Sequence, residues 1–176
     1  MGFLSFFTSR EDQNPPQAGS SLSSMVVDLG TFQVGSTWLG ALPSVSDPFH
    51  TVLTKDEVFQ PKGEGVEIGS EDGLFDYGFF TLAFFSGTFA LNGQTLRIHE
   101  ATSEDEIQQI FGEPYWIDRS DGEIILFYEY RAGTVELQFE FPDGKKLGFV
   151  TLSRNGVLAD RRQRESYGVD KPWPPP

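Results

Sequence analysis

The chain contains no cysteine, and only 2 of its 176 residues are histidine. The absence of thiols excludes disulfides, thiolate zinc sites, cysteine nucleophiles and a lipid-anchored N-terminal cysteine. Basic residues are scarce as well: 13 Lys and Arg stand against 26 Asp and Glu, which gives a net charge of -13. This balance argues against nucleic-acid binding, because such a surface needs cations that displace counterions. It favours solubility and attraction to a basic partner.

Known catalytic and ligand motifs are also missing. The sequence has no nucleophile elbow, zinc-protease helix, phosphate loop or dinucleotide fingerprint. His50 and His99 are isolated, and the acids at Glu104 to Glu106 lack the ladder spacing of a calcium loop. We therefore expect a non-enzymatic protein with no cofactor and no metal. A carboxylate-dependent enzyme is the least favoured alternative.

Long apolar runs are missing too. The longest, Gly78 to Ser86, is far too short to cross a membrane as a helix. The apolar start, residues 1–7, is too short for a signal core and has no basic residues before it. We expect a soluble, cytoplasmic protein of bacterial type that has no membrane partner.

Aromatic residues, glycine and proline are abundant. The 17 Phe supply core material, and 19 Gly with 11 Pro favour a turn-rich β protein. The composition along the chain predicts a flexible N-terminal arm (1–24), a single domain (25–155) and an extended Arg/Pro-rich tail (156–176). The tail either docks Trp173 on its own domain or offers a polyproline ligand to another protein, and we favour docking.

A short helix is predicted at about residues 103–111. Ser103 is the expected N-cap, and Glu106 completes a capping box. Ile107, Ile110 and Phe111 form the apolar stripe, and Gly112 with Pro114 ends the helix. The predicted fold class is therefore α+β: a mainly antiparallel sheet with one clear short helix packed on one face.

Two strand regions precede this helix. Gly78 to Ser86 has apolar residues at both odd and even positions, so both faces of a strand here would be apolar. This pattern predicts a strand that is covered on both faces or lies at an interface. Thr88 to Ile98 predicts a hairpin around Asn92-Gly93, the preferred pair for a type I′ turn. The two-residue loop pairs Leu91 with Gln94.

Turn sequences after the helix predict a register for the strands between residues 124 and 152. If Arg131 to Gly133 form a three-residue loop, Tyr130 lies opposite Thr134. The face under the helix then carries Ile125, Phe127, Val135, Leu137 and Phe139. The other face carries Ile124, Leu126, Tyr128 and Tyr130 opposite Glu136, Gln138 and Glu140. The turn at Pro142 to Gly144 places Leu147 and Phe149 on the core side, and Val150 and Leu152 outside.

The outer face of this sheet is the predicted partner-binding site. Tyrosine is enriched at protein interfaces because it offers a large area and a polar tip. The candidate residues are Tyr128, Tyr130, Glu136, Gln138 and Glu140. The alternative is that another layer of the chain, such as the strand at residues 79–85, covers this face.

The pattern Thr102-Ser103-x-x-Glu106-Ile107-x-x-x-Phe111-Gly112-x-Pro114 resembles the repeat unit of the β-lactamase-inhibitor-protein-like fold, to which small outer-membrane assembly lipoproteins are similar. The likeness covers residues 102–152. It implies a sheet whose aromatic and acidic outer face grips a partner protein. Bacterial immunity proteins, which are of similar size and acidity, add an analogy. The expected function is protein binding in an immunity or inhibitor-like role. A small-ligand or lipid-binding β domain, with a cavity under Phe79 to Phe85, stays open as an alternative.

Overall fold

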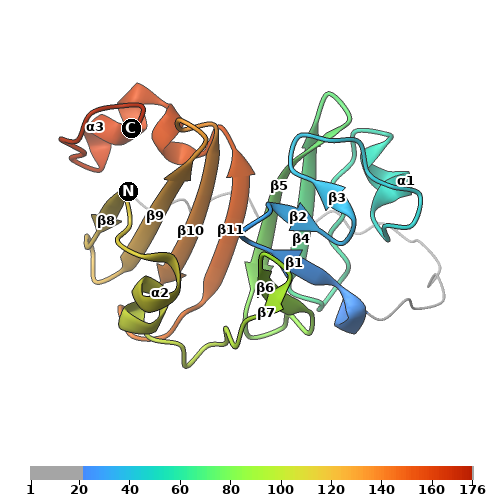
Figure 1. Cartoon of the computed structure of the whole chain (residues 1–176), viewed down its shortest axis with the longest axis horizontal. Coiled ribbons are helices and arrows are strands. Elements are labelled where there is room, and N and C mark those ends of the chain that lie inside the picture. Colours follow the sequence, from blue (N-terminus) through green and yellow to red (C-terminus); the bar gives the residue numbers. More distant parts are fainter. Residues whose placement is uncertain (1–21, 176) are drawn as a thin grey trace.

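The computed structural model describes residues 22–175, and within them two β-sheets and a few short helices form the fold (Figure 1). The smaller sheet has the order β3-β2-β1-β6-β7 and the larger one β4-β5-β11-β10-β9-β8. All pairings are antiparallel except that of β1 with β6. The predicted α+β class with mainly antiparallel sheets is therefore confirmed.

The elements of the smaller sheet are β1 (Val26–Asp28), β2 (Gln33–Val34), β3 (Thr37–Trp38), β6 (Thr88–Leu91) and β7 (Gln94–Thr95). Those of the larger sheet are β4 (Val66–Glu71), β5 (Leu74–Thr81), β8 (Trp116–Asp118), β9 (Ile124–Tyr130), β10 (Val135–Phe141) and β11 (Phe149–Arg154). The helices are η1 (Leu22–Ser24), α1 (His50–Leu53), α2 (Glu104–Phe111), η2 (Val157–Ala159) and α3 (Arg161–Ser166). Most of the predicted N-terminal arm, residues 1–21, lies outside the described residues.

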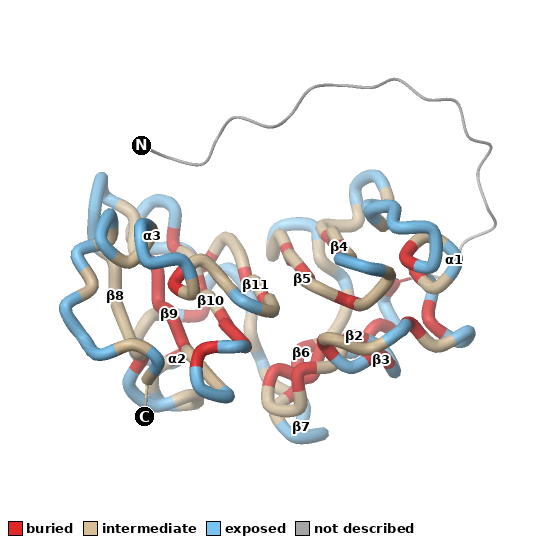
Figure 2. Tube along the Cα trace, turned by 90° about the horizontal axis from the view of Figure 1, so that it is seen from above, coloured by how far each residue is buried: buried red, intermediate tan, exposed pale blue. Residues whose placement is uncertain are grey.

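The core lies on one face of the larger sheet, which we call the inner face. The smaller sheet covers this face beside β5, where the rings of Phe80 and Phe89 lie 5.7 Å apart. Helix α2 covers it beside β10, where the rings of Phe111 and Phe139 lie 5.0 Å apart. Figure 2 shows that β9 is largely buried, whereas β5 and β11 alternate between buried and intermediate residues. The opposite, or outer, face is therefore less completely covered.

The predicted helix and its caps are confirmed, whereas in the predicted apolar stripe Ile107 is buried and Ile110 and Phe111 are half-buried. The Ser103 side chain accepts from the Glu106 N–H, and the Glu106 carboxylate accepts from the Ser103 N–H at 2.8 Å. Gly112 follows with φ +82°, a conformation that glycine adopts without strain. Ile107 is fully buried against the inner face. Interactions within one turn of the chain fix this element.

The predicted Asn92-Gly93 turn and its strand pairing are also confirmed, although the second strand ends at Thr95 and not at Ile98. Leu91 pairs with Gln94, and both turn residues have positive φ, +52° and +81°. The buried Asp28 side chain accepts from the backbone N–H groups of Asn92 and Gly93. It also accepts from two N–H groups of its own turn. This carboxylate therefore ties the β1–β2 turn to the hairpin.

The predicted register of β9 and β10 is wrong by one residue. Tyr130 pairs with Val135, because Arg131 to Thr134 form a four-residue loop in which Arg131, Ala132 and Gly133 all have positive φ. A shift of one residue moves every side chain of one strand to the opposite face relative to its neighbour. Tyr128 and Tyr130 consequently share the inner face with Val135, Leu137 and Phe139, while Ile125 and Phe127 lie on the outer face.

The predicted faces of β11 are reversed as well. Leu147 is buried as expected, but it lies in the loop before the strand, and its N–H binds the Glu100 carbonyl. The alternation of inner-face and outer-face side chains in β11 therefore cannot be counted from Leu147. Val150 and Leu152 are fully buried on the inner face, and Phe149 lies on the outer face opposite Glu140.

Two further boundaries differ from the prediction. The strand predicted to run to Ser86 ends at Thr81, whose carbonyl accepts from the N–H groups of Phe84 and Phe85 in a turn toward the other sheet. The segment predicted to be an extended tail contains η2 and α3. Docking of Trp173 on the chain itself is confirmed, because its ring lies over Gly133.

Candidate functional site

The five candidate partner-binding residues do not share one surface. Tyr128 and Tyr130 lie on the inner face, whereas Glu136, Gln138 and Glu140 lie on the outer face. The tyrosines therefore cannot form one patch with the acids, and that part of the prediction is wrong. The cause is the four-residue loop between β9 and β10.

Tyr128 is a core residue. It is 3% exposed, its ring packs on Phe111 and Phe139, and its hydroxyl donates to the Gly112 carbonyl at 2.9 Å. Burial raises its pKa above the ordinary value, because a phenolate would be poorly solvated there. Tyr130 is half-buried against the Phe32 ring at 5.2 Å. Both tyrosines link the larger sheet to the elements that cover its inner face.

The C-terminal segment, residues 156–173, covers one half of the outer face. Leu158 is fully buried with Ile125 and Phe127, and the Tyr167 ring meets the Phe127 ring edge-on at 5.2 Å. The Tyr115 hydroxyl donates to the carbonyls of Lys171 and Pro172. Figure 1 shows η2 and α3 gathered at one end of β9 and β10. We call this part of the outer face the covered half.

Glu136 attaches the C-terminal segment to the sheet. It is fully buried, and its carboxylate accepts from the N–H groups of Val157 and Leu158, each at 2.9 Å. Gln138 donates a further, short hydrogen bond to it. Gly156 makes this possible, since a Cβ at this position would lie 2.3 Å from Glu136 atoms. Glu136, predicted to bind a partner, thus binds backbone of its own chain.

Glu129 lies opposite Glu136 in the β9–β10 register. Both of its carboxyl oxygens are inaccessible to solvent, and among the described residues Glu136, through the proton of Glu129, is the group that shares a hydrogen bond with them. Burial, and secondly the neighbouring Glu136, raise the pKa of Glu129 from 4.5 to about 10. Glu129 is therefore protonated at neutral pH. The pair resembles a carboxylate dyad, but the C-terminal segment separates its oxygens from any solute.

The other half of the outer face is not covered by any described element, and we call it the open half. It consists of half-buried side chains from four strands: Glu67, Tyr77, Phe79, Gln138, Glu140, Phe149 and Thr151. The rings of Phe79 and Phe149 stack with centroids 5.2 Å apart at an interplanar angle of 26°. Glu140 lies opposite Phe149 in the register. An aromatic pair and carboxylates are thus adjacent on one accessible surface.

Two carboxylates shape the charge of the open half. The Tyr77 hydroxyl donates to Glu67 at 2.6 Å, with the Tyr77 ring lying across Gly69, where a Cβ would lie 1.9 Å from it. Burial, and secondly Glu123, raise the pKa of Glu140 to about 6. At neutral pH Glu140 therefore carries negative charge, although it is poorly solvated. A poorly solvated carboxylate of this kind forms a strong charge-assisted hydrogen bond with a cationic side chain.

Sequence reasoning missed Phe79, Phe149, Tyr77 and Glu129. For Phe149 the reason was the loop residue Leu147, which interrupts the alternation. Gly69 in β4 was the available indication for Tyr77, because an aromatic ring often lies across a glycine on a neighbouring strand. Glu129 was the only acid in an otherwise apolar strand and stood opposite another acid once the loop length was known.

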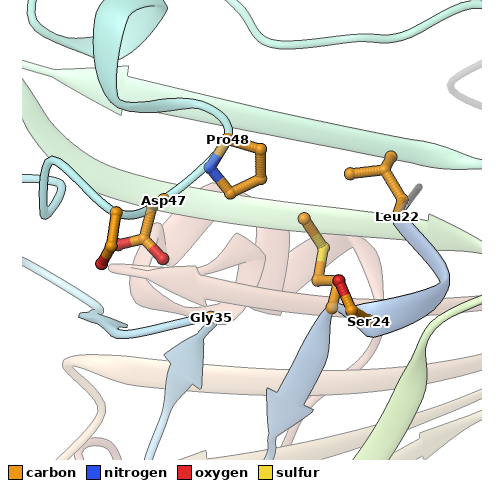
Figure 3. Close-up of a pocket in the computed structure, with 7 residues that line it drawn as sticks. Leu22, Ser24, Gly35, Asp47 and Pro48 are labelled. Carbon is orange, nitrogen blue, oxygen red and sulfur yellow. The ribbon is translucent and has the colours of Figure 1, made fainter. Parts of the chain in front are cut away.

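A separate hollow of about 230 Å³ lies beside η1. Figure 3 shows Leu22 and Ser24 on one side of it and Asp47 and Pro48 on the other. The Asp47 carboxylate is already bound by the Ser36 N–H and hydroxyl, the Thr37 hydroxyl and the Ser44 N–H. This acid therefore closes a turn and is not available to a ligand.

Other kinds of site find little support in residues 22–175. No group of three or more His, Asp or Glu in this part of the chain could hold a metal ion. None of its helices has the length and apolar character needed to span a bilayer. The ring Nδ1 of His50 bonds to the Pro43 carbonyl, and that of His99 accepts from the Ala101 N–H, so both histidines stabilise local turns.

Comparison of the chain with protein-family models, curated proteins and solved structures finds no significant match.

Proposed function

We propose that this chain is a non-enzymatic protein-binding module that recognises a basic partner through the open half of the outer face. The observation that supports this most is the stacked Phe79–Phe149 pair beside Glu140. An immunity or inhibitor-like role is the most concrete form of the proposal. Gln138 and Glu140 remain from the predicted site, and Tyr128, Tyr130 and Glu136 do not.

The chemistry of the open half suits a protein partner. Aromatic side chains supply large contact areas and dominate binding energy when a partner covers them. Neighbouring carboxylates attract a cationic partner and mainly raise the association rate. The net charge of -13 strengthens this attraction at long range. The expected partner surface therefore carries Lys or Arg around an apolar centre.

No observation favours the small-ligand alternative. Phe80 and Phe85, which were expected to line a cavity, pack on each other and on Phe89. Phe79 lies on the outer face. None of these residues lines the hollow beside η1.

The decisive experiment compares one aromatic residue in the open half with another elsewhere. A partner captured with the wild-type chain is identified, purified and titrated against Phe149→Ala, Glu140→Gln and the control Trp38→Ala. Trp38 is 48% exposed on β3, in the other sheet. Phe149→Ala should weaken binding by about 30-fold, which corresponds to about 2 kcal/mol for a central aromatic anchor.

Glu140→Gln should slow association at low salt and leave dissociation nearly unchanged. Trp38→Ala should bind like the wild type. Equal affinity of wild type and Phe149→Ala, or loss of binding in Trp38→Ala alone, would refute the open half as the binding surface.

A further inference from the structure

The covered and open halves are parts of one continuous surface. In the β9–β10 register, Phe127 lies opposite Gln138 and Ile125 lies opposite Glu140. Each pair joins a residue of the covered half to one of the open half. The C-terminal segment therefore lies on the same kind of surface that the proposed partner would use, immediately beside it.

The segment itself has the chemistry expected of a basic partner. Residues 156–176 contain four basic and three acidic residues, so residues 1–155 carry a net charge of -14. The Arg164 guanidinium lies 4.7 Å from the Trp173 ring centroid and donates to the carbonyls of Leu158 and Ala159. Tyr167 and Trp173 supply the aromatic contacts. The C-terminal segment thus brings cationic and aromatic side chains to an acidic, aromatic surface.

The fit of this occupant is incomplete at one position. No N–H or O–H group of the other described residues donates to the buried oxygens of Glu129, which share a hydrogen bond with Glu136 through the proton of Glu129 itself. Arg164 lies near enough to influence the charge of Glu129, but no hydrogen bond joins them. A buried carboxyl that accepts no hydrogen bond leaves part of its desolvation cost without compensation. A different occupant that supplies a donor to Glu129 would gain that free energy.

We propose that the C-terminal segment is a displaceable cover, and that the binding surface extends beneath it and accepts a basic, aromatic-bearing segment of the partner in its place. This inference rests on the proposed function. It adds that the partner competes with residues 156–173 and reaches Glu129 and Glu136. The surface available to the partner would then include Ile125 and Phe127.

The test uses the full chain and a labelled synthetic peptide of residues 156–176 as the probe, with binding followed by fluorescence anisotropy. Two variants loosen the chain's own segment: Gly156→Val, which creates a clash with Glu136, and the double variant Tyr167→Ala with Trp173→Ala. Arg161→Ala is the matched control, because among residues 22–175 the Arg161 side chain pairs with Glu165 of its own helix and not with the sheet.

Both loosened variants should bind the peptide at least 10-fold more tightly than the wild type, while Arg161→Ala should match the wild type. A peptide with both aromatic residues replaced by alanine should bind at least 10-fold more weakly than the unaltered peptide. Thermal melting checks that each variant unfolds cooperatively.

Equal peptide affinity of wild type and folded loosened variants would overturn the proposal. A doubled mass in solution, showing exchange of the segment between two copies, would also overturn it, because the occupant would then be a second copy. No partner enters this measurement. A negative result of the peptide experiment is therefore distinguishable from unchanged partner binding by Phe149→Ala, which would refute the proposed function.

Discussion

The two halves of the outer face have similar side chains and opposite environments. Phe127 and Glu136 in the covered half are 1% and 0% exposed, whereas Phe149 and Glu140 in the open half are half-buried. Glu136 binds two backbone N–H groups of its own chain, and Glu140 has no such partner in the described residues. Aromatic and acidic composition alone therefore does not identify a binding surface. What distinguishes the halves is whether the chain already satisfies those groups.

The largest effect is expected from a residue on neither half. Tyr128→Ala should destabilise the fold by about 3–5 kcal/mol, because it removes a buried ring between Phe111 and Phe139. Urea unfolding measures this directly. A loss below about 1 kcal/mol would mean that the ring is not in the core, as such a value is typical of surface positions. The exposed tyrosine patch would then have to be reconsidered.

The sequence predicts what short-range interactions determine. The α2 capping box and the Asn92-Gly93 turn depend on residues within four positions of one another, and both are as expected. The β9–β10 register was not predictable in this way. Its loop holds the non-glycine residues Arg131 and Ala132 at positive φ, a conformation that local preference disfavours.

Long-range packing also decides which acids are available. The observed register sets Glu129 opposite Glu136, although like charges in that position destabilise a sheet. The arrangement is tolerated because Glu129 is protonated and Glu136 binds Val157 and Leu158. Neither the protonation of Glu129 nor the backbone contacts of Glu136 can be inferred from the sequence of residues 124–141 alone. Of the predicted site residues, only Gln138 and Glu140 therefore lie on the open half of the outer face.

A second experiment sharpens the comparison of the two acids. Glu136→Ala should cost about 2–3 kcal/mol, since two buried N–H groups lose a charged acceptor. Glu140→Ala, the equivalent change in the open half, should alter the free energy of unfolding by less than about 0.5 kcal/mol, as is usual for surface positions. Hydrogen exchange at Val157 and Leu158 should accelerate in the first variant only. Equal costs would show that the halves do not differ as described.

The protonated acid predicts a pH dependence. The pKa of Glu129 is about 10 in the folded chain and near 4.5 when unfolded, so folding retains a proton between these values. Stability should therefore fall as pH rises above about 4.5. Tyr115, Glu136 and Arg164 are the other titratable groups that act on this site.

Glu129→Gln removes this titration. The variant should be more stable than the wild type by on the order of 1–2 kcal/mol at pH 8, with most of that advantage gone at pH 5. Urea unfolding of both proteins across this range provides the measurement. Parallel stability curves would show that Glu129 is already ionised in the folded chain, and that the C-terminal segment does not protect it from water.

The smallest effect on stability is expected in the open half itself. Phe149→Ala should cost about 1 kcal/mol, since it removes one stacked aromatic contact from a half-buried position. Phe127→Ala, at the matched position of the covered half, should cost about 3–5 kcal/mol because that ring is buried beneath Tyr167. Unfolding both variants under the same conditions measures the difference between an available and an occupied aromatic residue. If Phe149→Ala were as costly as Phe127→Ala, the open half would be part of the core, and Phe79 and Phe149 would be unavailable to a partner.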